Sequence, residues 1–203
     1  MVPGARRRPQ AARREPYDLE SVVDVALEVF LERGYDATSM EDLANAAGVT
    51  KSAFYYHVSG KEELLRRGLE RALSALFAIL EEPGSQEGPA MERLAHVLRR
   101  TTEVEVELLP AVSVLLHTRG NSETQREALA RRRDFDHAVA GLLGEAMAEG
   151  TVRADLDPEL AARLVIGMVT WVVEWYRPGG SLSGTALADA ILAIVMNGLR
   201  ARG

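Results

Sequence analysis

The segment from Thr38 to Lys61, TSMEDLANAAGVTKSAFYYHVSGK, constrains this chain more than any other. Thr38 is a candidate helix N-cap, and Glu41 three residues later completes the pattern of a capping box. Gly48 predicts the end of this first short helix, because glycine adopts a left-handed backbone without steric cost. Thr50 is placed to cap a second helix. Two short helices joined by a glycine turn predict a helix-turn-helix, whose second helix fits the DNA major groove.

The second helix carries the polar side chains that DNA binding requires. Phe54 is its expected inward anchor. We predict DNA contacts from Thr38, Thr50, Lys51, Ser52, Tyr55, Tyr56, His57 and Lys61. Among these residues, Tyr55, His57 and Lys61 are expected to hold phosphates, and Lys51, Ser52 and Tyr56 to face base edges. The alternative for this segment alone is an ordinary helical hairpin with a half-buried aromatic cluster.

The same segment resembles the signature of TetR-type bacterial transcriptional regulators. The resemblance rests on VTKSAFYYHVSGKEELL and extends back through ESVVDVALEVFLERGYDATSM. It covers about the first third of the chain, and the remainder only by helix layout. Val58 stands where the family usually has phenylalanine, which predicts slightly looser core packing. Gly60 stands where serine or asparagine is also common.

Residues 1–16 form a basic arm on an otherwise acidic chain. The whole sequence has a net charge of -6, yet residues 1–16 contain five arginines and a single acid, Glu15. The prolines in this arm oppose a continuous helix. Two interpretations stay open, a disordered solubilising tail or an arm in which Arg13 and Arg14 reach the DNA minor groove.

Hydrophobic periodicity predicts an all-α fold. A helix over 18–33 is expected to complete an N-terminal three-helix, helix-turn-helix DNA-binding domain over 17–60. Residues 61–203 are expected to form a C-terminal helical domain for ligand binding and dimerisation. Its helices are predicted over 61–80, 90–106, 110–118, 122–149, 158–176 and 185–200, with a flexible break over 82–89. The helix over 61–80 either carries motion from a distant site to the DNA or is a rigid connector.

The two last helices predict a dimer interface. The helix over 158–176 is apolar almost all round from Leu164 to Tyr176, and such a helix must be buried on every side. A position between its own core and a second subunit satisfies this requirement. On the last helix we predict interface residues Leu187, Ile191, Ile194 and Val195. Two helices from each subunit would form a four-helix interface, which resembles the dimerisation of TetR-type regulators.

The family resemblance also implies a ligand cavity inside the helical body. We predict its lining from Phe77, Leu115, Leu116, Phe135, Val139, Met168, Trp171 and Trp175, although such residues are more often core. The segment WVVEWYRPGGSLS resembles a TetR subgroup, frequent in actinobacteria, that responds to acyl-CoA thioesters in lipid or steroid breakdown. Arg131 to Arg133, or Arg177, would then lie toward the CoA phosphates, although arginines on a helix more often form a solvated face. The alternative is a sensor of apolar drugs that controls an efflux pump.

Other classes of function fit the sequence poorly. The chain has no cysteine, no GxSxG or HExxH motif and no phosphate-binding glycine loop, so we expect neither an enzyme nor a metal or cofactor. A structural DNA-bending protein would not need the large apolar second half. No apolar run reaches the roughly 20 residues of a membrane helix, and the basic N-terminus lacks the apolar core of a secretory signal. We therefore expect a cytoplasmic homodimeric repressor whose partners are operator DNA and a small-molecule effector, with no membrane partner.

Overall fold

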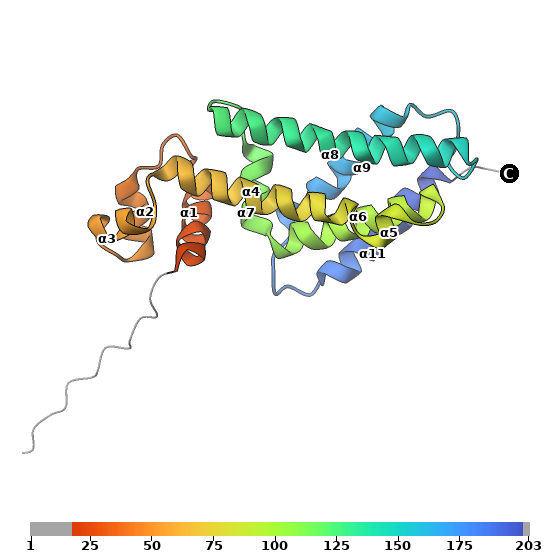
Figure 1. Ribbon diagram of the computed structural model, residues 1–203. Coiled ribbons are helices and arrows are strands. Elements are labelled where there is room, and N and C mark those ends of the chain that lie inside the picture. Colours follow the sequence, from red (N-terminus) through yellow and green to blue (C-terminus); the bar gives the residue numbers. More distant parts are fainter. Residues whose placement is uncertain (1–17, 201–203) are drawn as a thin grey trace, which may run out of the picture.

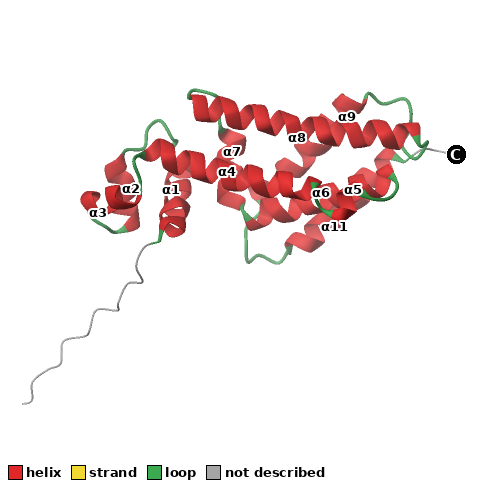
Figure 2. Cartoon of the chain, in the orientation of Figure 1, coloured by secondary structure: helices red, strands yellow, loops and turns green. Residues whose placement is uncertain are grey.

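The computed structural model describes residues 18–200, except for the side chains of Ala53, Tyr56 and His57. The arginines of the expected arm, Arg13 and Arg14, lie outside the described residues. The described chain is all-α, as predicted (Figures 1 and 2). Its β-type backbone pairing consists of one isolated bridge, between Val152 and Arg200. Its helices are α1 (Leu19–Arg33), α2 (Met40–Ala47), α3 (Lys51–His57), α4 (Lys61–Leu80), α5 (Pro83–Gln86), α6 (Ala90–Glu107), α7 (Leu109–His117), α8 (Glu123–Ala148), α9 (Pro158–Thr170), α10 (Val172–Trp175) and α11 (Gly184–Leu199).

Helices α1, α2 and α3 form a small unit at one end of the molecule (Figure 1). Gly34 and Gly48 end α1 and α2 with φ values of 81° and 67°, in the left-handed region that favours glycine. Phe54 is fully buried, as expected for the anchor of α3, and Val58 is also buried. The small residue Gly68 on α4 lets α1 approach closely, since a Cβ at Gly68 would lie 2.4 Å from Cδ2 of Leu27.

The N-cap of α2 differs from the prediction by one residue. Ser39, not Thr38, caps the helix: the Ser39 hydroxyl accepts a hydrogen bond from the Asp42 N–H, and the Asp42 carboxylate accepts one from the Ser39 N–H. The hydroxyl of Thr38 instead donates to the carbonyl of Gly34 at 2.7 Å. The capping box therefore exists, but it begins one residue later than predicted.

Helices α4 and α8 run along the length of the body, and α6, α7 and α9 pack against them (Figure 1). Helix α11 packs on α6 and α9. The expected flexible break over 82–89 contains the short helix α5, and the buried Ser85 hydroxyl donates to the carbonyl of Ile79 at 2.6 Å. This segment is therefore an ordered turn, because its polar groups bond back to α4.

The expected helix over 158–176 is divided into α9 and α10. Trp171 is both the C-cap of α9 and the N-cap of α10, and its N–H bonds to the carbonyl of Gly167. Among the described residues, none of the helices is both long enough and apolar enough to cross a membrane.

Candidate DNA-binding and effector sites

Helix α3 presents an exposed polar surface at the tip of the molecule. Lys51 and Ser52 are exposed, Thr50 before the helix is exposed as well, and the Tyr55 side chain keeps 47% of its surface accessible. The predicted contacts Tyr56 and His57 belong to the same helix, but their side chains are not described. The buried Phe54 fixes which face of α3 points outward. The outward groups stay predicted DNA contacts.

Lys61 and Thr38 are bonded inside the protein, and these bonds oppose their predicted role as DNA contacts. The ammonium of Lys61 donates to the carbonyl oxygens of Tyr35, Asp36 and Thr38 at 2.9, 3.2 and 3.0 Å. It also lies 4.6 Å from the centroid of the Tyr35 ring. An ammonium has three donors, so these bonds use all of them. The Thr38 side chain is 2% exposed, and its hydroxyl is bonded to Gly34.

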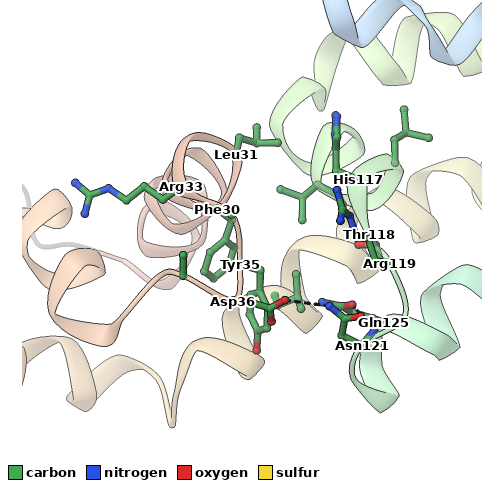
Figure 3. A pocket seen from close by; sticks show the side chains of 15 residues that line it. Phe30, Leu31, Arg33, Tyr35, Asp36, His117, Thr118, Arg119, Asn121 and Gln125 are labelled. Carbon is green, nitrogen blue, oxygen red and sulfur yellow. Dashed lines mark hydrogen bonds between the residues drawn. The ribbon is translucent and has the colours of Figure 1, made fainter.

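The loop between α1 and α2 also connects the end of the molecule formed by α1, α2 and α3 to the remaining helices, the body. We name this end the DNA-binding end after its predicted role. The Tyr35 hydroxyl donates to the Glu62 carboxylate, and the Ser122 hydroxyl at the start of α8 donates to Glu62 at 2.8 Å. The Asn121 amide donates to the Asp36 carboxylate at 3.0 Å, the dashed line in Figure 3. The hydrogen bond from Tyr35 is the largest cause that lowers the pKa of Glu62, which keeps the carboxyl ionised. We call these residues, Tyr35, Asp36, Lys61, Glu62, Asn121 and Ser122, the domain junction.

An open cleft of about 650 Å³ lies beside the domain junction (Figure 3). Its lining from the DNA-binding end includes Phe30, Leu31, Arg33 and Tyr35, and its lining from the body includes His117, Thr118, Arg119 and Gln125. Because the two walls come from opposite sides of the junction, the relative position of the DNA-binding end and the body determines the width of this cleft.

A second, small cavity lies inside the body between α4, α6, α7, α8 and α9. We call it the effector cavity. Its volume of about 20 Å³ is close to the space that one water molecule requires. Its apolar lining consists of Leu76, Val112, Leu115, Leu116, Phe135 and Ile166. Its polar lining consists of Thr101, Glu105, Arg132, Asp136 and Thr170.

The predicted ligand residues fall into three groups. Leu115, Leu116 and Phe135 line the effector cavity. Phe77 contacts the Phe135 ring edge-on, with centroids 6.1 Å apart, and Val139 is fully buried in the core without lining the cavity. Met168, Trp171 and Trp175 keep 44%, 65% and 47% of their surfaces exposed. Their assignment to the cavity is wrong, because the helical turn of α9 directs Ile166 and Thr170 inward instead.

Two acidic residues of the effector cavity were missed by the sequence analysis. Glu105 is 1% exposed, and neither its Oε2 atom nor Oδ1 of Asp136 has a hydrogen-bond partner in the described part of the chain. Burial raises the pKa of Glu105 to about 8, opposed by the positive charge of Arg132. Burial also raises the pKa of Asp136. One signal was available: Glu105 follows Leu98 and Thr101 at helical spacing, on the buried face of α6.

The predicted phosphate-binding arginines do not share one environment. Arg131 pairs with Glu70 and lies 5.5 Å from the centroid of the Phe77 ring. Arg132 lines the effector cavity, while Arg133 and Arg177 are exposed. Of the three consecutive arginines, Arg132 alone is therefore placed to act on a molecule in the cavity.

An apolar stripe is exposed on α9, α10 and α11. From Leu160 to Trp175 its residues recur every three or four positions, and Ile194 adds an exposed apolar side chain on α11, with 65% of the surface of Leu164 and 64% of that of Ile194 accessible. The stripe consists of Leu160, Leu164, Met168, Trp171, Trp175 and Ile194. Three residues predicted at the interface, Leu187, Ile191 and Val195, are instead buried in the core of the chain itself. Their assignment is wrong, because that face of α11 packs on α6 and α9, and Ile194 points to the opposite side.

Two family models match the chain. The one for the bacterial regulatory proteins of the tetR family covers residues 22–67. The one for the tetracyclin repressor-like C-terminal domain covers residues 87–199, more than half of the chain. The chain belongs to the TetR family. Proteins of this family are transcriptional regulators and not enzymes, so the exposed surface of α3 belongs to a DNA-binding regulator.

Individual TetR proteins resemble the whole chain. SCO3833 of Streptomyces coelicolor A3 is 52% identical, with a TM-score of 0.83 and 94% of each chain covered. The repressor KstR2 of Mycobacterium tuberculosis is 29% identical over 90% of this chain and 92% of its own length. Its structure, that of a ketosteroid transcriptional regulator, has a TM-score of 0.83 at 26% identity. AibR, solved with isovaleryl coenzyme A and operator DNA, shares the fold at 24% identity, a TM-score of 0.73 and coverage of 87% of this chain and 96% of its own.

The bonds of Lys61 predict a structural effect for the substitution Lys61→Met. Loss of three bonds to carbonyl oxygens should lower the free energy of unfolding by about 1–3 kcal/mol. Affinity for DNA should fall through misplacement of α3, while the salt dependence of binding stays unchanged, because no phosphate contact is lost. Urea unfolding and binding titrations at several salt concentrations measure both effects. The exposed Lys51→Met variant is the control and should keep its stability. Unchanged stability with a reduced salt slope in Lys61→Met would restore the phosphate role.

The burial of Glu105 predicts that the protein loses stability as pH rises. The folded-state pKa of about 8 lies above the ordinary value of 4.5, so the folded protein holds this proton at pH values where the unfolded chain has released it. The free energy of unfolding should fall by roughly 2 kcal/mol or more between pH 5.5 and pH 8.5. Urea unfolding at fixed protein concentration measures this loss. Glu105→Gln should flatten the profile, the exposed Glu107→Gln should not, and equal slopes in all three proteins would contradict the assignment.

Proposed function

We propose that this TetR-family protein is a homodimeric repressor that binds a palindromic operator in the cytoplasm and is released by an acyl-CoA thioester. One observation carries the proposal: the effector cavity is lined by α4 and α8, the two helices that also begin at the domain junction. A molecule that enters the cavity acts directly on both helices that hold the DNA-binding end. The division into a DNA-binding domain over 17–60 and a body over 61–203 is part of this proposal.

The exposed apolar stripe supports the homodimer. Large apolar side chains in a continuous row are unusual on the surface of a monomer and are typical of a protein interface. A second copy placed on α9 and α11 would cover the stripe and leave α3 of each subunit exposed. A symmetric dimer fits a palindrome when its two recognition helices lie about 34 Å apart. Lys51, Ser52, Tyr55, Tyr56 and His57 are the proposed contacts, with Arg13 and Arg14 of the arm.

The small volume of the effector cavity supports release by a change in helix positions. A cavity of about 20 Å³ cannot hold an acyl chain, so a ligand must separate the helices around it. The separation would displace the starts of α4 and α8, where Glu62 and Ser122 are bonded to each other. A ligand shifts this equilibrium only as far as it prefers the separated form. Almost complete switching requires a preference of roughly 5.5 kcal/mol.

An apolar acyl chain attached to CoA, which carries negatively charged phosphates, fits the lining. Six apolar side chains would surround an acyl chain, and burial of apolar surface supplies about 25 cal/mol per Å². Arg132 on the same wall attracts phosphate and repels a cation. The AibR complex, which contains isovaleryl coenzyme A, supports the CoA carrier, and KstR2, a ketosteroid regulator, supports an apolar effector. The second candidate is a sensor of cationic drugs. The unpaired carboxyl oxygens of Glu105 and Asp136 favour it, and the positive charge of Arg132 opposes it.

The stripe predicts that Ile194→Glu disrupts the dimer. A glutamate at the centre of the interface would be buried without a partner, which destabilises association by roughly several kcal/mol. Light scattering should show a monomer, and specific DNA binding should be lost. Leu31→Glu, an exposed leucine on α1 outside the stripe, is the control and should remain dimeric. A dimeric Ile194→Glu protein would place the interface elsewhere.

Release of the protein from its operator tests the effector class. The operator can be selected from random DNA with the full-length protein. Octanoyl-CoA should release the bound protein at a concentration at least tenfold lower than octanoate, because the CoA phosphates add charge-assisted contacts. Tetraphenylphosphonium serves as the apolar cation. Equal potency of octanoate would remove the CoA part of the proposal, and release by the cation alone would favour the drug sensor.

A further inference from the structure

We propose that the effector of this protein carries a neutral hydrogen-bond donor within its apolar part, a hydroxyl or an amide N–H, and that the carboxyl group of Glu105 accepts this bond. The inference rests on the proposed effector site and specifies the ligand chemistry that the site selects.

Glu105 lies where a carboxyl group is costly. Its side chain is 1% exposed on the cavity face of α6, and its Oε2 atom accepts no hydrogen bond from the described residues. A buried polar atom without a partner destabilises a folded protein, because burial removes its hydrogen bonds to water and nothing replaces them. Native proteins leave few such atoms, so an unpaired carboxyl oxygen in a cavity wall indicates a partner that is not part of the chain.

The neighbouring hydroxyl groups cannot supply that partner. Thr101, one turn before Glu105, donates its hydroxyl to the carbonyl of Val97 at 2.8 Å. Thr170 on the facing helix α9 donates to the carbonyl of Gly167 at 3.4 Å. A hydroxyl group has one donor, so both threonines of the cavity wall are already committed. Arg132, the cationic donor of the cavity lining, also forms no hydrogen bond with the Oε2 atom of Glu105. The occupant of the cavity can supply the donor that the described lining does not.

The charges around the cavity favour a neutral donor over a cation. Arg132, on α8, lines the same cavity and acts electrostatically on both Glu105 and Asp136. A cationic ligand would be repelled by this guanidinium, whereas a hydroxyl or amide N–H would not. Burial favours the protonated form of Glu105 at neutral pH, and a protonated carboxyl still offers its carbonyl oxygen. Oδ1 of Asp136, across the cavity on α8, provides a second unpaired acceptor.

This chemistry predicts selection against plain hydrocarbon chains. A chain without a donor would separate the helices and still leave the acceptor of Glu105 unpaired. Sites built to bond a substrate hydroxyl discriminate strongly against analogues that lack it. The lining thus selects apolar molecules with a hydroxyl or amide group in their buried part.

Two pairs of small probes test the inference on the full-length protein by calorimetric titration. The first pair is 1-octanol and octyl methyl ether, and the second is N-methyloctanamide and N,N-dimethyloctanamide. Within each pair the apolar chain is the same, and one member lacks the donor. The wild-type protein should bind the donor-bearing member of at least one pair roughly tenfold more tightly. The pair that shows the difference identifies the source as a hydroxyl or an amide N–H.

Variants of Glu105 assign the difference to its carboxyl group. Glu105→Leu should bind both members of each pair equally, and Glu105→Gln, which keeps a carbonyl acceptor, should retain part of the preference. Glu107→Gln, an exposed carboxylate on the same helix, is the matched control and should behave as wild type. If Glu105→Leu does not fold, the wild-type and Glu105→Gln comparison decides.

Three results would overturn the inference: equal affinities within both pairs in the wild type, a preference of full wild-type size in Glu105→Leu or Glu105→Gln, or no binding of any probe. These results are distinct from failure of the proposed function, which the release of operator by octanoyl-CoA tests. Octanoyl-CoA can release the protein while the probe pairs bind equally, and the probe preference can hold while octanoyl-CoA has no effect.

Discussion

The orientation of the DNA-binding end depends on the ammonium group of Lys61. Its three bonds collect the carbonyl oxygens of Tyr35, Asp36 and Thr38 around one point, and these residues connect α1 to α2. Glu62, the next residue, bonds both Tyr35 and Ser122, so two adjacent side chains at the start of α4 join the DNA-binding end to the body. The loop between α1 and α2 is thereby fixed relative to α4 and α8.

Local signals in the sequence predicted the element boundaries well, and they failed where two neighbours are chemically equivalent. Gly48 ends α2 as expected, and Gly34, Ser122 and Asp157 end or cap other helices close to their predicted bounds, because each effect depends on a single residue type. The cap of α2 moved from Thr38 to Ser39 because both carry a hydroxyl, and each is followed three residues later by an acid. Which of the two residues caps the helix depends on whether the other hydroxyl has a different partner. Here the Thr38 hydroxyl bonds the carbonyl of Gly34.

The contacts of the candidate sites were harder to predict because they join distant parts of the chain. A lysine near a recognition helix is typical of a phosphate contact. The local sequence around Lys61 does not reveal that its ammonium bonds three carbonyl oxygens 23 to 26 residues earlier. Apolar periodicity identified α11 but not which of its faces is outward, so Ile194 and Ile191 received the same role. Glu105 was overlooked because its neighbours Glu103 and Glu107 give the segment the appearance of a solvated face.

Because α8 is one uninterrupted helix, a tilt at the cavity is magnified at its N-terminal end, where Ser122 bonds Glu62. Arg132 and Asp136 in the cavity wall lie 10 to 14 residues beyond Ser122, which corresponds to a helix arm of about 15–20 Å. A tilt of roughly 5° about the cavity would move the far end of this arm by about 1.5 Å. A hydrogen bond of 2.8 Å does not survive such a displacement. A ligand that separates the helices in the body would thus break one hydrogen bond at the N-terminal end of α8, without any bending of the backbone between the two sites.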